Sequence, residues 1–180
     1  MMKKNLLLVF LFLLSFSAKA THIVGGEFEL RYRSDFDYTL ILNLYFDDVN
    51  GNPAAEDPVI DAVIYEKGTN RVIATIQLSK NADDQVPYTN PACAVGDLRT
   101  RKIIYSENIE LSAATFNNPA GYYVVWERCC RNNIITNINN PSGTGTVFLL
   151  EFPPVVSSTG TRFINSSPSF VTFHIPIWSY

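Results

Sequence analysis

The segment that most constrains the fold is residues 38–46, YTLILNLYF. Its residues alternate between two sets, and one set is entirely apolar: Tyr38, Leu40, Leu42, Leu44 and Phe46. Successive side chains of a strand point to opposite faces, so a period of two residues is typical of a strand with one face in a core. We therefore expect residues 38–46 to form a central strand.

Further strand-like runs follow along the chain. Residues 59–79 contain two β-branched runs around residues 67–70, where Gly68 and Asn70 suit the positive φ of a tight hairpin. Residues 81–97 are polar and predict a long loop. Turn-like residues separate the remaining runs, RKIIYSENIEL, AGYYVVWERCC, TGTVFLLEFPP and FVTFHIPIW. About eight short strands of this kind predict an all-β fold, an immunoglobulin-like antiparallel β-sandwich.

The first residues have the pattern of a secretory signal. Lys3 and Lys4 precede an apolar run at residues 6–16, and Ala18-Lys19-Ala20 matches a small-residue cleavage site. An apolar run of about eleven residues is shorter than the roughly twenty needed to span a bilayer. We expect a signal peptide at 1–20, a β-sandwich domain at 21–168, and an edge strand or truncated linker to a following module at 169–180. The predicted location is extracellular or at the outer cell surface, with no membrane span after cleavage.

Charge argues against one class of partner. Without the three lysines of residues 1–20, 11 basic residues stand against 17 acidic ones, a net charge of −6. Nucleic-acid binding calls for clustered Lys and Arg, so we expect no nucleic-acid partner.

The three cysteines, Cys93, Cys129 and Cys130, are disulfide candidates in an exported protein. An odd count allows one intramolecular bridge, and a bridge from Cys93 to either of the others closes a loop of about 36 residues, worth about 3–4 kcal/mol. A vicinal Cys129–Cys130 bond is the alternative. A zinc site is disfavoured because the three thiols lack a CxxC spacing.

The stretch Ile23-Val24-Gly25-Gly26 resembles the activating N-terminus of chymotrypsin-like proteases. Such an enzyme needs a Ser-His-Asp triad, and the two histidines, His22 and His174, have no matching serine or aspartate motif around them. We therefore predict that the protein is not an enzyme. The two glycines instead predict a bend or bulge as the first strand begins.

Two further sets of residues are candidate binding sites. Oxygen-bearing side chains crowd residues 47–57 and faintly match a calcium loop: Asp47, Asp48, Asn50, Asn52, Glu56 and Asp57. The competing interpretation is a solvated turn, which Asn-Gly-Asn favours. Trp178 and Tyr180 at the end of the chain are candidates for contact with sugars or proteins, whereas Trp126 resembles the buried tryptophan of immunoglobulin-like cores. Beyond the candidate calcium site, no cofactor is expected.

Several strings together suggest a family. HIVGGEFELRY, NPAC, GYYVVWERCCRNNIITNI and NSSPSF resemble the N-terminal domain of large PKD-repeat surface proteins of gliding bacteria that use type IX secretion. The resemblance implies an immunoglobulin-like head domain with a structural or adhesive role toward other surface proteins or glycans. The family's disulfide scheme does not carry over whole, because Asp48 stands where the family often has a cysteine and no second cysteine closely follows Cys93. A small carbohydrate-binding or enzyme-accessory domain is the alternative function, and the sequence leaves the oligomeric state open.

Overall fold

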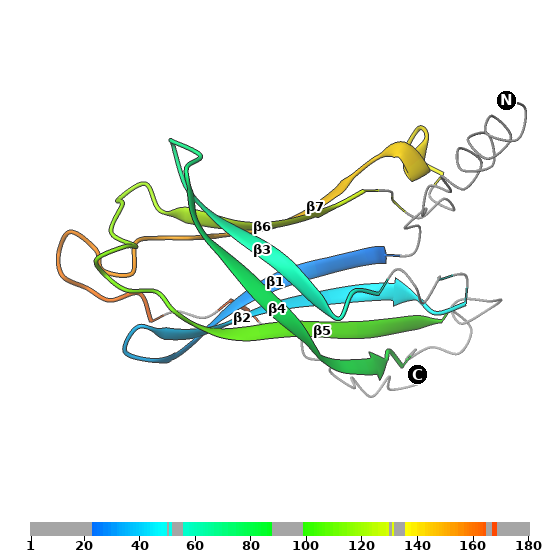
Figure 1. Cartoon of the computed structure of the whole chain (residues 1–180), viewed down its shortest axis with the longest axis horizontal. Coiled ribbons are helices and arrows are strands. Elements are labelled where there is room, and N and C mark those ends of the chain that lie inside the picture. Colours follow the sequence, from blue (N-terminus) through cyan, green and yellow to red (C-terminus); the bar gives the residue numbers. More distant parts are fainter. Residues whose placement is uncertain are drawn as a thin grey trace, which may run out of the picture.

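The computed structural model describes residues 23–49, 51, 56–87, 99–129, 131, 136–164 and 167–168. Seven strands and a short 3-10 helix, Pro141–Gly143, make up the regular structure of this part (Figure 1). The strands are β1 (Ile23–Ser34), β2 (Asp37–Asp47), β3 (Val59–Glu66), β4 (Val72–Gln85), β5 (Thr100–Glu110), β6 (Tyr122–Arg128) and β7 (Thr146–Phe152). The predicted all-β fold class is confirmed.

The strand order is immunoglobulin-like. All pairings are antiparallel and give one sheet with the order β1-β2-β5-β4-β3-β6-β7. Divided between β4 and β3, this order reproduces the ABED and CFG sheets of a constant-type immunoglobulin domain. The β3–β4 hairpin crosses obliquely and joins the two layers, while β1 and β7 come into contact on the other side (Figure 1). The two layers are therefore parts of one bent, nearly closed sheet. The eighth strand expected near the C-terminus lies outside the described residues.

The alternating apolar residues meet in a single core between the layers. As expected, β2 is central, between β1 and β5, and all five residues of its apolar set are at most 4% exposed. Trp126 is also buried, with its ring centroid 5.8 Å from that of Phe148. It lies on β6, the counterpart of strand F, whereas the tryptophan of antibody domains lies on strand C. The expected burial is confirmed, but the strand is a different one.

A tyrosine at the start of β6 anchors the connection from β5. Tyr122 is fully buried, and its hydroxyl donates to the Thr115 carbonyl at 3.1 Å and accepts from the Asn118 amide at 2.8 Å. This is the geometry of the tyrosine corner at the E–F connection of immunoglobulin-like folds. Val124 stands two residues later, where antibody domains have a cysteine, and packs in the core instead.

The glycine and turn predictions are confirmed. A register shift between Ile23 and Gly25 bends the start of β1, and a Cβ at Gly26 would lie only 2.6 Å from the Asn43 carbonyl oxygen. The β3–β4 turn places Gly68 and Asn70 at φ values of 87° and 56°.

One predicted boundary was wrong. The long loop was expected from residue 81, but β4 continues to Gln85. A bulge between Lys80 and Ala82 shifts the register, and pairing with β5 then resumes. The polar side chains after the bulge have partners on β5 and in the β2–β3 connection: Asp83 binds Arg101, and Gln85 donates to Asp48.

Candidate functional site

An apolar row crosses the outer face of β3, β6 and β7. The strand register pairs Val63 with Val125 and Val125 with Leu149, so the three side chains lie side by side on the same face. On β7, Val147 and Leu149 are 56% and 52% exposed. In the described part of the chain, no further layer packs on this face (Figure 1).

Two tyrosines form the adjacent row on the same face. Tyr65 and Tyr123 are cross-strand partners whose rings stack with centroids 5.1 Å apart. The Tyr123 hydroxyl donates to Asn70 at 2.9 Å, and Lys67 and Glu151 form an ion pair at 2.7 Å near the edge of the row. We call this surface the outer CFG face and define it by Val63, Tyr65, Tyr123, Val125, Val147 and Leu149.

A groove opens beside this face because β3 and β6 diverge. Their ladder ends at Val63 and Val125, although β3 begins four residues earlier and β6 continues to Arg128. The groove has a volume of about 420 Å³, and the buried residues Ile60 and Trp126 line it together with outer-face residues. Its complete lining is Asp57, Val59, Ile60, Asp61, Val63, Tyr65, Val125, Trp126 and Glu127.

Acidic side chains line this groove. Extending the register beyond the last pair places Asp61 opposite Glu127, one on each wall, and both are exposed. Asp57 forms an ion pair with Arg128, and the Arg128 guanidinium lies 5.9 Å from the centroid of the Trp126 ring. The groove thus combines an apolar base with carboxylates on both sides.

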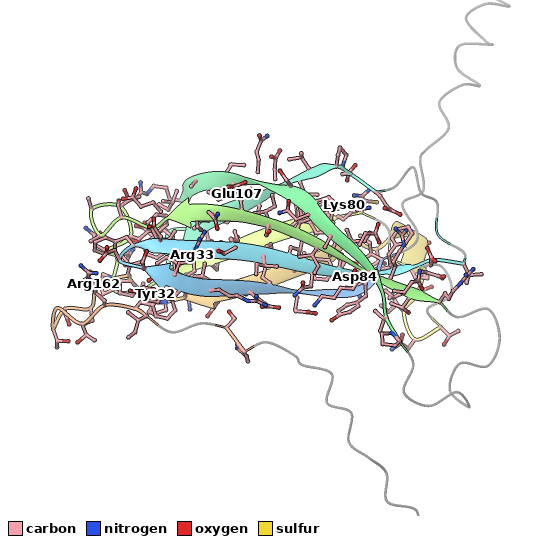
Figure 2. The ribbon with its side chains drawn as sticks, turned by 90° about the horizontal axis from the view of Figure 1, so that it is seen from below. Tyr32, Arg33, Lys80, Asp84, Glu107 and Arg162 are labelled. Carbon is pink, nitrogen blue, oxygen red and sulfur yellow. The ribbon has the colours of Figure 1, made fainter. Side chains whose placement is uncertain are left out.

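The other layer is different in character. Charged side chains from its strands, including Arg33, Asp84 and Glu107, spread over it (Figure 2). On its outer face Glu29 is only 3% exposed and accepts hydrogen bonds from Asn43 at 2.6 Å and from Arg31 at 2.5 and 2.8 Å. These polar groups are satisfied within the layer, which makes it less suitable than the outer CFG face for an apolar partner.

A charged cluster closes one end of the sandwich. Arg101 binds Asp48 at 2.9 Å, Asp83 at 2.5 Å and Glu56, while its guanidinium lies 5.4 Å from the Phe46 ring centroid. Lys80 adds ion pairs to Glu56 at 2.8 Å and to Asp83 at 2.6 Å. The cluster joins β4 and β5 to the β2–β3 connection and therefore has a structural role.

Hydrogen bonds keep the carboxylates of this cluster ionised. The pKa of Asp48 is lowered, first by the hydrogen bond from Gln85 and then by the charge of Arg101, against an opposing effect of burial. Burial raises the pKa of Glu56, but the hydrogen bonds from Arg101 and Lys80 outweigh it, and the net pKa is lowered.

The predicted calcium residues occupy different environments. Asp48 and Asp57 are ion-paired to arginines, and Asp47 is 1% exposed, with a carboxylate oxygen accepting from the Val49 amide at 3.1 Å. Asn50 and Asn52 lie outside the described residues. Within the described ranges, no three His, Cys, Asp or Glu side chains are grouped to hold a metal. A calcium site therefore stays a prediction.

The remaining predicted residues are only partly covered. Cys129, directly after β6, is disulfide-bonded. Cys93 and Cys130 lie outside the described residues, so the pairing stays a prediction. The same holds for Trp178 and Tyr180 as binding residues.

The outer CFG face was not singled out in the sequence, although a signal was present. Val147, Phe148, Leu149 and Leu150 are apolar without alternation, which is typical of a strand covered on both faces. On β7 only one of those faces is covered by the core, so the second apolar set marks a surface open to a partner.

The fold and this surface define an all-β, antiparallel, immunoglobulin-like module with an exposed apolar face. Comparison with models of known protein families, with curated proteins and with solved structures finds no match. In the described part of the chain, no helix is both long and apolar enough to cross a bilayer.

Proposed function

We propose that this protein is an exported, non-catalytic immunoglobulin-like module that binds a partner at the cell surface through the outer CFG face. The observation that carries the proposal is the apolar row Val63, Val125 and Leu149, which continues to the exposed residues of β7. Large contiguous apolar patches on the surface of a soluble domain, especially those with a polar rim, mark interaction sites. The partner is a surface protein, and the role is structural or adhesive.

Two features of the chain support export. Residues 1–20 have the composition of a secretory signal, and the disulfide at Cys129 fits an oxidising compartment. The resemblance to head domains of gliding-bacterial surface proteins agrees with the immunoglobulin-like strand order. On this basis we infer that the module is the N-terminal head of a gliding-motility-associated surface protein.

Carbohydrate binding is the second candidate function. The stacked rings of Tyr65 and Tyr123 lie on the same outer face, beside exposed carboxylates that could bind sugar hydroxyls. Aromatic rings with a polar tip are suited to such contacts. The two candidates share the surface and differ in the chemistry of the partner.

Site-specific photo-crosslinking tests the proposal. A photoreactive amino acid replaces Leu149 on β7, and the control carries it at Glu107, an exposed residue of the other layer (Figure 2). The cells are those that naturally make the protein. We expect a discrete protein adduct from position 149 and none from position 107.

Three other outcomes would decide against protein binding. An adduct containing only carbohydrate would favour the second candidate. Equal adducts from both positions, or none from position 149, would contradict binding through the outer CFG face.

A further inference from the structure

We propose that the groove between β3 and β6 binds an extended segment of the partner by strand addition, with a lysine or arginine side chain of that segment between Asp61 and Glu127. This inference rests on the proposed binding function and adds the chemistry of the partner. It follows from the backbone on the two walls, from the carboxylates, and from the apolar base.

The hydrogen-bond alternation directs backbone groups into the groove. The Lys67 amide donates to the Gly121 carbonyl at 3.0 Å, so odd-numbered residues of β3 direct their N–H and C=O groups toward β6. The Pro58 carbonyl accepts from Lys80 on β4 at 3.0 Å, which confirms that even-numbered residues face the opposite way. Past the end of the ladder, Val59 and Asp61 therefore direct their peptide groups into the groove.

The same alternation holds for β6. Gly121 accepts from Lys67, and Tyr123, Val125 and Glu127 follow Gly121 at intervals of two residues, so Glu127 directs its peptide group toward β3. Both walls thus offer strand-edge donors and acceptors to a guest. An extended peptide satisfies such groups by adding a strand, whereas a globular surface does not.

The carboxylates determine the charge of the guest. Asp61 and Glu127 lie beyond the last pair of the ladder, one on each wall of the groove, so two negative charges line the same gap. A cation between them removes their repulsion and gains charge-assisted hydrogen bonds. The walls formed by Val63 and Val125 accommodate the aliphatic stem of a lysine or arginine.

The chain itself contains an example of this arrangement. At the end of the groove, the Arg128 guanidinium lies over Trp126 and pairs with Asp57. A guest arginine would repeat the contact one step along the groove, between an apolar floor and carboxylates.

Charge complementarity selects a foreign basic segment over a second copy. The whole chain has a net charge of −3, and three carboxylates line the groove, of which only Asp57 is paired with Arg128 at the end of the groove. Two such faces would repel each other at low ionic strength. A basic extended segment of a surface protein is therefore the occupant to which we commit.

NMR titration with model peptides tests the inference. The probe is acetyl-Thr-Val-Arg-Val-Thr-amide, with citrulline and glutamate analogues at the central position. The protein is the secreted product of the full chain, labelled with ¹⁵N. We expect the arginine peptide to shift the amide signals of Asp61, Val63, Val125 and Glu127, the citrulline peptide to bind about tenfold more weakly, and the glutamate peptide to cause no shift.

Isosteric variants then test the two carboxylates. The double variant Asp61→Asn with Glu127→Gln should bind the arginine and citrulline peptides equally. The matched control Glu107→Gln, which changes an exposed carboxylate on the other layer, should keep the tenfold difference. Well-dispersed spectra verify that each variant is folded.

Several results would overturn the inference. These are equal binding of the three peptides, no shift of the amide signals at millimolar peptide, or loss of the tenfold preference for arginine in the control variant Glu107→Gln as well. Concentration-dependent shifts of the same signals without peptide would assign the groove to a second copy. Residues 88–98 contain Cys93, the predicted disulfide partner of Cys129. Peptide-induced shifts that occur only after Cys129→Ser would therefore assign the groove to this segment of the chain itself. If any of these results is found while the photo-crosslink at position 149 still forms, only the inference about the groove is wrong. If that crosslink does not form either, the proposed function is also wrong.

Discussion

Replacing Tyr122 by phenylalanine removes a hydroxyl that makes two hydrogen bonds inside the protein, to the Thr115 carbonyl and from the Asn118 amide. The side chain is fully buried, and the rings of Phe116 and Phe152 lie with centroids 5.1 and 5.5 Å from it. Phenylalanine keeps these ring contacts, so the change isolates the hydroxyl. Two hydrogen bonds at about 1 kcal/mol each, plus the cost of leaving backbone groups unsatisfied, predict a loss of about 2–3 kcal/mol.

Urea unfolding measures this loss. For a slope of about 2 kcal/mol per molar, the midpoint of the Tyr122→Phe variant should fall by about 1–1.5 M. The neighbouring tyrosine provides a matched control, because the Tyr123 hydroxyl makes an exposed hydrogen bond to Asn70. Tyr123→Phe should change the unfolding free energy by less than about 0.5 kcal/mol. Equal effects of the two substitutions would refute the tyrosine corner as an anchor of the fold.

Three further predictions concern acid stability, backbone packing and the disulfide. Hydrogen bonds from Thr69, Asn118 and Arg71 lower the pKa of Glu66 from 4.5 to about 2. The ionised carboxylate therefore stabilises the fold above pH 4.5, and this stability is lost as the pH falls toward 2. Between these pH values, the urea midpoint of Glu66→Gln should decline less steeply than that of the unmodified protein. Gly26→Ala should lower the free energy of unfolding by about 1–3 kcal/mol, because the new Cβ would lie 2.6 Å from a backbone oxygen of β2. Gly25→Ala is the control, since a Cβ there meets its nearest atom only at 4.0 Å. Thermal melts of the two variants test this difference. Mass spectrometry of the unreduced protein should find a peptide joining Cys93 to Cys129. A bond between Cys129 and Cys130 instead would disprove the long-range pairing.

Local patterns were sufficient for the predictions that were confirmed. The alternation in β2, the turn with Gly68 and Asn70, and the bend before Gly26 each depend on a few adjacent residues. Side-chain periodicity and backbone sterics act at that range. The end of β4 was mispredicted because polar residues after its bulge remain in the sheet through partners on β5 and in the β2–β3 connection.

The exposure of the outward residues depends on the position of each strand. On β2, Ile41 and Asn43 point away from the core and are still only 7% and 2% exposed, because β2 lies between β1 and β5. On β7 the outward residues Val147 and Leu149 are more than half exposed, because β7 has a single hydrogen-bonded neighbour. The outward set of β2 includes the polar Asn43 and is buried, whereas that of β7 is apolar there and exposed, so polarity in the sequence does not predict which outward residues are covered.

By itself, the sequence determined that the chain is all-β, where most strands begin and end, and that Trp126 and the apolar set of β2 belong to the core. The tertiary structure decided the order of the strands, the tyrosine corner and the candidate surface. The groove exists because β3 pairs with β6 only from Val63 onward, while the preceding residues of β3 pair with β4 alone. Such pairings join residues about 60 positions apart, so no local pattern encodes them.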